Sequence, residues 1–302
     1  MLNLLRKVRN TRAHAAKARL IADINIILSK DVNPDTRRSE AAFEDLQNRY
    51  PLRPAYGYDP FNLFQRAANR AVQILSQAQA GDQALKILDI GAGDGMLGAL
   101  LATAGHKVTL CDLEDWRTEP AKGLTFISAD CCAGIPQESN EFDLVCSFNT
   151  FEHLVDPTSA FEEVFRVTRP GGLIYLDFGP LYCSPWGLHA YQSLRMPYPQ
   201  YLFSPEFINS KLGELGIWDL GRKRTELQHL NRWTVSQFAN LWRRSRLDVI
   251  ASNPYSIEEH MGLIQRYPEC FCGRGLTFED VTCGNIMVTL RKLKRDALRE
   301  PH

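Results

Sequence analysis

The residues best suited to chemistry lie in one short stretch of the chain. An apolar segment that starts at Lys86 carries Asp89 near its end, and three glycines follow at alternate positions, Gly91, Gly93 and Gly95. Glycines there allow a tight turn and let the backbone approach a bound nucleotide, because a Cβ would block the approach or strain the turn. The acid adds a fixed charge at the same place. The stretch predicts a site for a ligand with a hydroxylated, partly cationic nucleoside end.

The same stretch allows a second interpretation. Residues 93–98 satisfy the pattern G-x-G-x-x-G, and Asp112 follows at about the distance expected of a ribose-binding acid. On these residues alone, a nicotinamide or flavin oxidoreductase is an alternative function. Asp89 argues against it, because dinucleotide sites usually have no acid where the pyrophosphate must lie.

Four further motifs follow: Ala129-Asp130, Glu141-Phe142-Asp143-Leu144-Val145, Phe151-Glu152-His153-Leu154 and Arg166-Val167-Thr168-Arg169-Pro170-Gly171-Gly172. Together with the glycine stretch they resemble the class I S-adenosylmethionine (SAM) methyltransferases, and the last two resemble its small-molecule branch. The resemblance covers residues 56–180 well and 232–292 loosely. It implies SAM as cofactor and in-line methyl transfer to a small molecule, such as a saccharide or natural-product intermediate. An RNA methyltransferase and an inactive SAM-binding subunit are the alternatives within the fold.

The resemblance implies a role for each residue of the cofactor site. Asp89 would hold the methionine ammonium, and the three glycines, at 91, 93 and 95, would lie beside the adenosyl and methionine parts. Asp112 would accept hydrogen bonds from both ribose hydroxyls, since a carboxylate offers two acceptor oxygens. Asp130 would accept from the adenine amine, and the backbone N–H of Cys131 would face adenine N1.

The methionine end of the cofactor is expected between two parts of the chain. Asn149 and Phe151, beyond the fourth predicted strand, would line it from one side. A helix predicted over residues 61–77 would close it from the other. Tyr58, Arg66 and Arg70 on or beside that helix would reach the methionine carboxylate.

Three side chains are candidates for removing a proton from the acceptor, and we expect His189 to act as the base, with His153 as the competing candidate. Glu152 and His153 follow the fourth strand, and His189 lies in a segment rich in aromatic residues. The unperturbed pKa of histidine, near ~6.5, suits proton removal at neutral pH. No metal is expected, because the cysteine spacings lack a second zinc-type pair. A metal held jointly by Glu152, His153 and His189 is a weaker alternative.

These residues need a sheet whose strands end at one edge. Apolar runs predict strands near 86–90, 107–112, 124–130, 142–149, 172–179, 247–254 and 284–291, and helices fill the gaps, the clearest at 158–168. The fold class is therefore α/β. We expect a Rossmann-like, seven-stranded, mostly parallel sheet with helices on both faces. The resemblance implies that the last strand is antiparallel and lies between the fifth and sixth.

The chain divides into four expected parts. Residues 1–55 would form a basic N-terminal helical extension and a connector, 56–180 the SAM-binding core, 181–246 a substrate-binding lid, and 247–302 the return of the core. The lid follows the fifth strand, so it would lie over the ligand crevice. We expect Tyr182, Trp186 and Tyr191 in it to contact the substrate.

Composition limits the partners. The formal net charge of the 302 residues is zero, so whole-chain charge predicts no polyanion partner, and nucleic acid is not expected. A basic, aromatic-rich segment over 222–246 keeps RNA as an alternative, although an anionic small molecule suits it better.

The basic N-terminal helix would cover the core, or contact a membrane surface or a partner. No secretory signal is visible, which predicts free thiols and a cytoplasmic protein. A homo-oligomer stays open.

Overall fold

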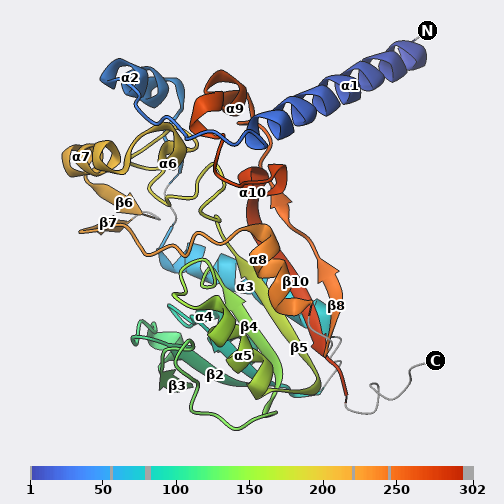
Figure 1. The fold of residues 1–302 in the computed structure, drawn as a ribbon. Coiled ribbons are helices and arrows are strands. Elements are labelled where there is room, and N and C mark those ends of the chain that lie inside the picture. Colours follow the sequence, from blue (N-terminus) through green and yellow to red (C-terminus); the bar gives the residue numbers. More distant parts are fainter. Residues whose placement is uncertain (1, 55–56, 79–82, 220–221, 244–245, 295–302) are drawn as a thin grey trace.

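A central sheet organises the fold of this computed structural model, which describes residues 2–54, 57–78, 83–219, 222–243 and 246–294 (Figure 1). Its strands are β1 (Lys86–Ile90), β2 (Lys107–Asp112), β3 (Thr125–Ser128), β4 (Phe142–Phe148), β5 (Thr168–Phe178), β8 (Leu247–Ser252) and β10 (Cys283–Lys292), in the order β3-β2-β1-β4-β5-β10-β8. The first five are parallel, and β10 runs antiparallel to β5 and β8. The predicted α/β class and the place of the last strand are confirmed. A short β9 (Tyr255–Ser256) also pairs with β10.

Helices cover both faces of the sheet because its strands are apolar on both sides. Successive residues of a strand point to opposite faces, so Leu88 and Val145 pack under one helical layer and Ile87 and Leu144 under the other. The first layer contains α5 (Pro157–Val167) and α8 (Val235–Trp242). The second contains α3 (Pro60–Ala78) and α4 (Met96–Thr103). Parallel strands buried on both faces show this continuous apolar pattern.

A third apolar cluster, which we call the cap, lies beyond the carboxyl edge of the sheet. It joins residues 20–50, 182–217, 227 and 261–281. Its elements are α1 (Leu2–Leu28), α2 (Glu40–Arg49), α6 (Pro199–Leu202), α7 (Pro205–Leu215), α9 (Gly262–Arg266), η2 (Pro268–Cys270) and α10 (Phe278–Thr282). The N-terminal part of α1 projects away from the body in Figure 1. None of the described helices combines the length and apolarity needed to cross a lipid bilayer.

The cap differs from the expected lid in three ways. Residues 40–49 form α2, where we expected a connector, because Ser39 caps the helix and Phe43 and Leu46 are buried against the cap. The expected lid also extends too far, since α8 packs on the sheet through Phe238. Finally, residues 261–281 of the expected core return belong to the cap.

The helix expected at 61–77 is α3. Leu63, Ala67 and Ile74 are its buried residues, whereas the neighbouring Phe64 is 52% exposed. Residues 63 and 64 are both apolar, and the larger side chain is the exposed one.

Candidate functional site

Two adjoining cavities lie at the carboxyl ends of β1, β2 and β4. The smaller one, about 330 Å³, reaches Asp112, Asp130 and Cys131. The larger one, about 700 Å³, is bounded by the glycine turn, the cap and the hairpin of β6 (Ile217–Asp219) and β7 (Arg222–Arg224). Both are lined by Gly91, Trp116, Asn149, His153 and Gln228. The shared residues make them two parts of one crevice, where ligands of open parallel sheets bind.

The glycine turn between β1 and α4 has backbone angles that side chains disfavour. Gly91, Gly93 and Gly95 have φ values of +70°, +54° and +72°. A Cβ on Gly91 would lie 2.0 Å from Thr150 Oγ1, and a Cβ on Gly95 would lie 2.6 Å from Ala121 Cβ. At Gly93 a Cβ would meet no atom within 4 Å. Steric contact therefore excludes side chains at the outer two positions, while the middle one is restricted by φ alone.

Two of the predicted acids accept backbone hydrogen bonds at the smaller cavity. Asp112 accepts from the amides of Gly93 and Leu113, each at 2.8 Å. Asp130 Oδ1 accepts from the amide of Cys132 at 2.8 Å. These bonds fix both carboxylates, and each carboxylate keeps lone pairs for further donors. The arrangement suits a ligand that presents hydroxyl and amine groups.

Asp89 lies behind the glycine turn, in a narrow space that also contains Arg66 and Arg70. Its side chain is buried, and Cys146 Sγ donates to its Oδ1 over 3.8 Å. Burial raises the pKa of Asp89 to about 7, although Arg70 acts in the opposite direction. A buried carboxyl held by a weak thiol donor would be stabilised as an anion by a cationic ligand group.

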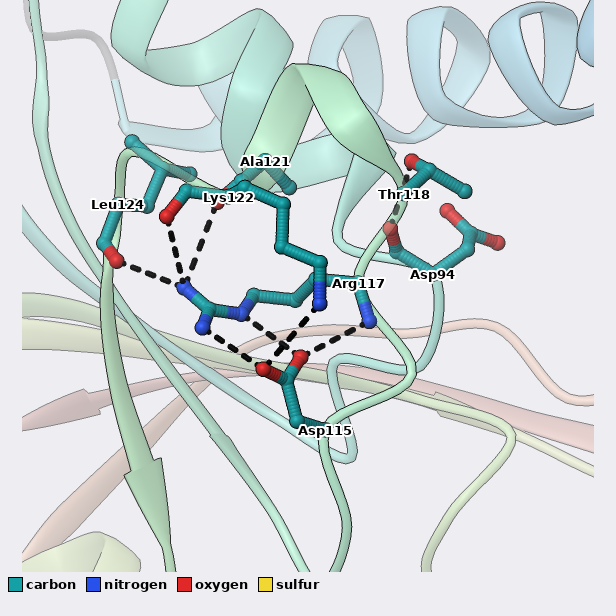
Figure 2. A network of polar contacts seen from close by, with 7 residues as sticks. All are labelled: Asp94, Asp115, Arg117, Thr118, Ala121, Lys122 and Leu124. Atoms are coloured by element: carbon teal, nitrogen blue, oxygen red, sulfur yellow. Dashed lines mark hydrogen bonds and ion pairs between the residues drawn. The ribbon is translucent and has the colours of Figure 1, made fainter.

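A polar network fixes the loop after β2 against the glycine turn (Figure 2). Arg117 holds Asp115 through two guanidinium nitrogens at 2.9 Å each, and donates to the carbonyl of Leu124 at 2.8 Å. The amide and hydroxyl of Thr118 both donate to the carbonyl of Asp94, at 2.9 and 3.0 Å. The network lies on either side of Trp116 in the chain. It therefore fixes the loop that carries this ring to the edge of both cavities.

Cationic side chains meet aromatic rings at the larger cavity. The Arg70 guanidinium lies 4.5 Å from the ring centroid of Phe148, and that of Arg222 lies 3.6 Å from the ring of Tyr58. Arg66 donates to the backbone carbonyl of Gly57. These contacts join the region around α3 to the β6–β7 hairpin. They give this part of the cavity a positive lining.

Glu152 and His153 approach each other at the wall of the larger cavity. Glu152 is 2% exposed, its Oε1 accepts from the amide of Gly179 at 3.0 Å, and its Oε2 has no hydrogen-bond partner. Burial raises the pKa of Glu152 to about 8. His153 Nδ1 donates to the carbonyl of His229 at 2.7 Å, and its Nε2 lies 3.8 Å from Glu152 Oε1.

His189 completes this group from the cap side. Its ring lies edge-on to that of His153, with centroids 5.0 Å apart. Nε2 donates to the carbonyl of Pro180 at 2.7 Å, whereas Nδ1 is buried without a hydrogen-bond partner. Burial lowers the pKa of His189 to about 4, so the ring is neutral at pH 7. The three candidates for proton transfer are thus brought together.

Three expected site residues lie elsewhere. Phe151 is fully buried beside Phe178 in the core under α5 and α8, so it does not line the methionine side. Trp186 is buried, with the guanidinium of Arg53 over its ring and the ring of His260 edge-on to it. Tyr182 packs against the cap cluster. Of the three expected substrate contacts, Tyr191 lines the larger cavity.

Sequence reasoning missed several residues that line the crevice, among them Trp116, Thr150 and Gln228. Trp116 is 58% exposed in a loop of acidic residues directly after Asp112. A large apolar side chain in such a polar loop was the available signal. Thr150 follows Asn149 in the chain and explains why position 91 must be glycine. Nothing in the sequence distinguishes Gln228.

Comparison with known proteins identifies the central part of the chain. Residues 88–176 match a family described as a methyltransferase domain. A tRNA 5-carboxymethoxyuridine methyltransferase from Escherichia coli (strain K12) is 31% identical over 111 residues, which cover 33% of this chain and 42% of that protein. A ubiquinone biosynthesis O-methyltransferase from Aromatoleum aromaticum is 31% identical over 106 residues, covering 32% and 45%. The chain thus spans less than half the length of these curated relatives.

Solved structures are also similar to this chain. A crystal structure of an S-adenosylmethionine dependent methyltransferase from Mesorhizobium loti has 20% sequence identity and a TM-score of 0.46, covering 75% of this chain and 100% of that one. A protein from Methanosarcina mazei, described in the same terms, has 20% identity and a TM-score of 0.45, covering 72% and 97%.

Proposed function

We propose that this chain, whose residues 88–176 match a methyltransferase domain, is a class I SAM-dependent methyltransferase that methylates an anionic small molecule held in the larger cavity. The observation that carries the proposal is the meeting of Asp112, Asp130 and the glycine turn at one crevice that continues into a positively lined cavity. Cavities of a few hundred Å³ are of the size that holds small ligands.

The described residues fit SAM. Asp112 would accept the ribose hydroxyls, and Asp130 with the Cys131 amide would hold adenine in the smaller cavity. Asp89, a buried carboxyl near Arg66 and Arg70, suits the zwitterionic methionine end. The ammonium group of that end would pair with the carboxyl of Asp89, and its carboxylate with the two guanidinium groups. Bound SAM supplies a methyl group already activated by the positive sulfur.

The remaining work for the protein is alignment and proton removal. His153 lines both cavities, so it lies where cofactor and acceptor would meet. Its Nδ1 donates to a carbonyl, which leaves Nε2 as the proton-accepting atom of the neutral ring. We therefore assign the base to His153. His189 would act beside it, because its ring is held edge-on to that of His153.

Charge supports an anionic acceptor. Beyond the arginines near Asp89 that suit the methionine end, the larger cavity is lined by Arg222, Lys223 and Arg224 from β7. Basic side chains on this wall of the cavity favour a phosphate, a carboxylate or a similar group. Arg222 is stacked on Tyr58, so its guanidinium is partly held in position before a ligand arrives.

A binding and activity series tests the proposal. Calorimetry should detect SAM and its demethylated product, but not NAD. Purified protein should then transfer the methyl group of labelled SAM to members of a panel of phosphorylated and carboxylated phenols, quinols and saccharides. Lys223→Glu should weaken transfer to the anionic acceptor without weakening SAM binding. NAD binding without SAM binding would contradict the whole proposal.

A nucleic-acid acceptor is the second candidate. One relative is described as a tRNA methyltransferase, and the β6–β7 hairpin carries three consecutive basic residues, Arg222, Lys223 and Arg224. If RNA is the acceptor, its binding should weaken steeply with salt, because phosphate contacts release counterions. Transfer to total tRNA, with none to the small-molecule panel, would decide for this candidate.

A further inference from the structure

One group at the wall of the larger cavity has the composition of a metal site. Glu152, His153 and His189 each place a possible ligand atom within 4.8 Å of the others. All three residues line the same cavity, so an ion would have a path from solvent. Two imidazoles and one carboxylate form a ligand set typical of divalent transition metals.

Backbone carbonyls fix the protonation of both rings. The carbonyl of Pro180 accepts from His189 Nε2, and that of His229 accepts from His153 Nδ1, each at 2.7 Å. Because a carbonyl oxygen can only accept, the neutral rings carry their lone pairs on His189 Nδ1 and His153 Nε2. Imidazoles that bind metals usually donate their other N–H to a carbonyl or carboxylate in this way.

Two buried atoms of the group lack a hydrogen-bond partner. They are Glu152 Oε2 and His189 Nδ1, and each residue is 2% exposed. Buried polar atoms are rarely left unpaired, because leaving water without a new partner costs free energy. A cation between these two residues would satisfy both atoms at once. The two unpaired atoms are evidence separate from the closeness of the three possible ligand atoms.

We propose that Glu152, His153 and His189 together bind one divalent ion of the zinc class at the wall of the larger cavity. Three protein ligands would leave a coordination position open towards the cavity. A tetrahedral ion about 2.1 Å from each ligand places the ligand atoms roughly 3.4 Å apart, so a pair at the 4.8 Å limit would have to close by about 1.4 Å and nearer pairs by less. Ion binding can be measured without methyl transfer. An ion on His153 Nε2 would take the lone pair that accepts a proton in the proposed function, so the base role of His153 belongs to the ion-free protein. The use of the ion, which would be to hold an acceptor oxygen, rests on the proposed function.

A second group must be separated from this one. Asp130, Cys131 and Cys132 also place their possible ligand atoms within 4.8 Å of one another. In that group Asp130 already accepts from the amide of Cys132. Adjacent cysteines also differ from the common zinc spacings. Thiolate ligands would be visible in the spectrum of a cobalt-substituted protein, whereas nitrogen and oxygen ligands would not give a thiolate charge-transfer band.

The first measurement is stoichiometry and ligand type. Full-length protein is treated with a chelator and titrated with Zn²⁺ by calorimetry, and with Co²⁺ by absorption spectroscopy. We expect one ion per chain and visible Co²⁺ bands without thiolate charge transfer. Absence of saturable Zn²⁺ binding, or a spectrum dominated by thiolate charge transfer, would overturn the proposal.

Variants then locate the ion. Glu152→Gln keeps an acceptor for the Gly179 amide, and His189→Asn suits the positive φ of +58° at that position. His153→Ala is the third variant. Each of the three single variants should weaken Zn²⁺ binding at least about 10-fold. His14→Ala, on an exposed part of α1, and Cys132→Ser should leave the affinity unchanged. Unchanged affinity in all three site variants would place the ion elsewhere.

Two further measurements distinguish loss of the fold, absence of the metal site and failure of the proposed function. Circular dichroism checks that each variant is folded, and if one ligand variant does not fold, the other two decide. SAM binding is measured on the same metal-free samples. Normal SAM binding and methyl transfer without any saturable ion would refute the metal site and leave the proposed function intact.

Discussion

Asp112 at the end of β2 holds Gly93 of the turn after β1, because its Oδ2 accepts the Gly93 amide at 2.8 Å. Its Oδ1 accepts the amide of Leu113 at the same distance. One carboxylate therefore joins two loops that end neighbouring strands, and it also lines the smaller cavity. The residue expected to contact the ribose is also one that shapes the glycine turn.

This double role makes Asp112 sensitive to small changes. Asp112→Ala should weaken SAM binding by about 1.5–3 kcal/mol, the range for hydrogen bonds to charged groups. Asp112→Asn keeps one acceptor oxygen and should fall between Ala and the unchanged protein. Calorimetry of SAM binding measures both, with Asp248→Ala on exposed β8 as the control. Wild-type affinity in a folded Asp112→Ala protein would remove Asp112 from the site.

Asp89 should make stability depend on pH. Its pKa rises from 3.8 to about 7 on folding, because burial disfavours the anion. Between these values the folded chain binds more protons than the unfolded chain, so the free energy of unfolding falls as pH rises from about 4 to 7. Asp89→Asn removes this effect. At pH 8 the variant should be more stable by about 2–4 kcal/mol, since each pKa unit corresponds to about 1.4 kcal/mol.

Urea unfolding at pH 4 and pH 8 measures the difference. The gain in stability should largely vanish at pH 4, where Asp89 is mostly protonated in the folded state. The same variant should bind SAM more weakly at pH 8, because a carboxylate is lost near the expected ammonium. An Asp89→Asn protein that is equally stable or less stable at pH 8 would show that Asp89 is not disfavoured by burial.

The glycine turn predicts a contrast between two similar substitutions. Gly91→Ala combines a positive φ with a Cβ only 2.0 Å from Thr150 Oγ1, so neighbouring atoms must move. Gly93→Ala has a positive φ but no contact within 4 Å, and should cost about 1–2 kcal/mol. Chemical denaturation should therefore show the larger loss of stability for Gly91→Ala. Equal losses would mean that Thr150 moves aside freely.

The sequence predicts the sheet far better than the cap. Acids at the ends of β1 and β2, at Asp89 and Asp112, stand out because the strands before them are apolar and the glycines fix the turn. Trp186 and Phe151 were misplaced because an aromatic residue in a loop suits a cavity wall and a buried interior equally well. Helix α2 was missed because only two of its residues, Phe43 and Leu46, are buried. Their partners are distant in the chain, and local patterns do not identify such partners.

The pairing of His153 with His189 was also beyond local patterns, since the two residues come from loops after different strands. The sequence favoured His189 as the base, and the structure gives reasons to prefer His153. The His189 ring is 2% exposed, and burial lowers its pKa to about 4, so it is a weak proton acceptor at neutral pH. His153 lies at the junction of the two cavities, where both cofactor and acceptor would be within reach.

His153→Ala should therefore lower the turnover number of the metal-free protein by about 10²–10⁴-fold, the usual loss when a general base is removed. SAM affinity should stay nearly unchanged, because Asp112 and the glycine turn remain. His189→Asn should lower turnover less than His153→Ala, by loosening the neighbouring ring. Steady-state kinetics with the identified acceptor and calorimetry with SAM measure the two effects separately. If His189→Asn abolishes turnover while His153→Ala does not, the two roles are reversed. If neither variant changes turnover, the acceptor reacts without a protein base, and catalysis depends on how the cavity aligns it.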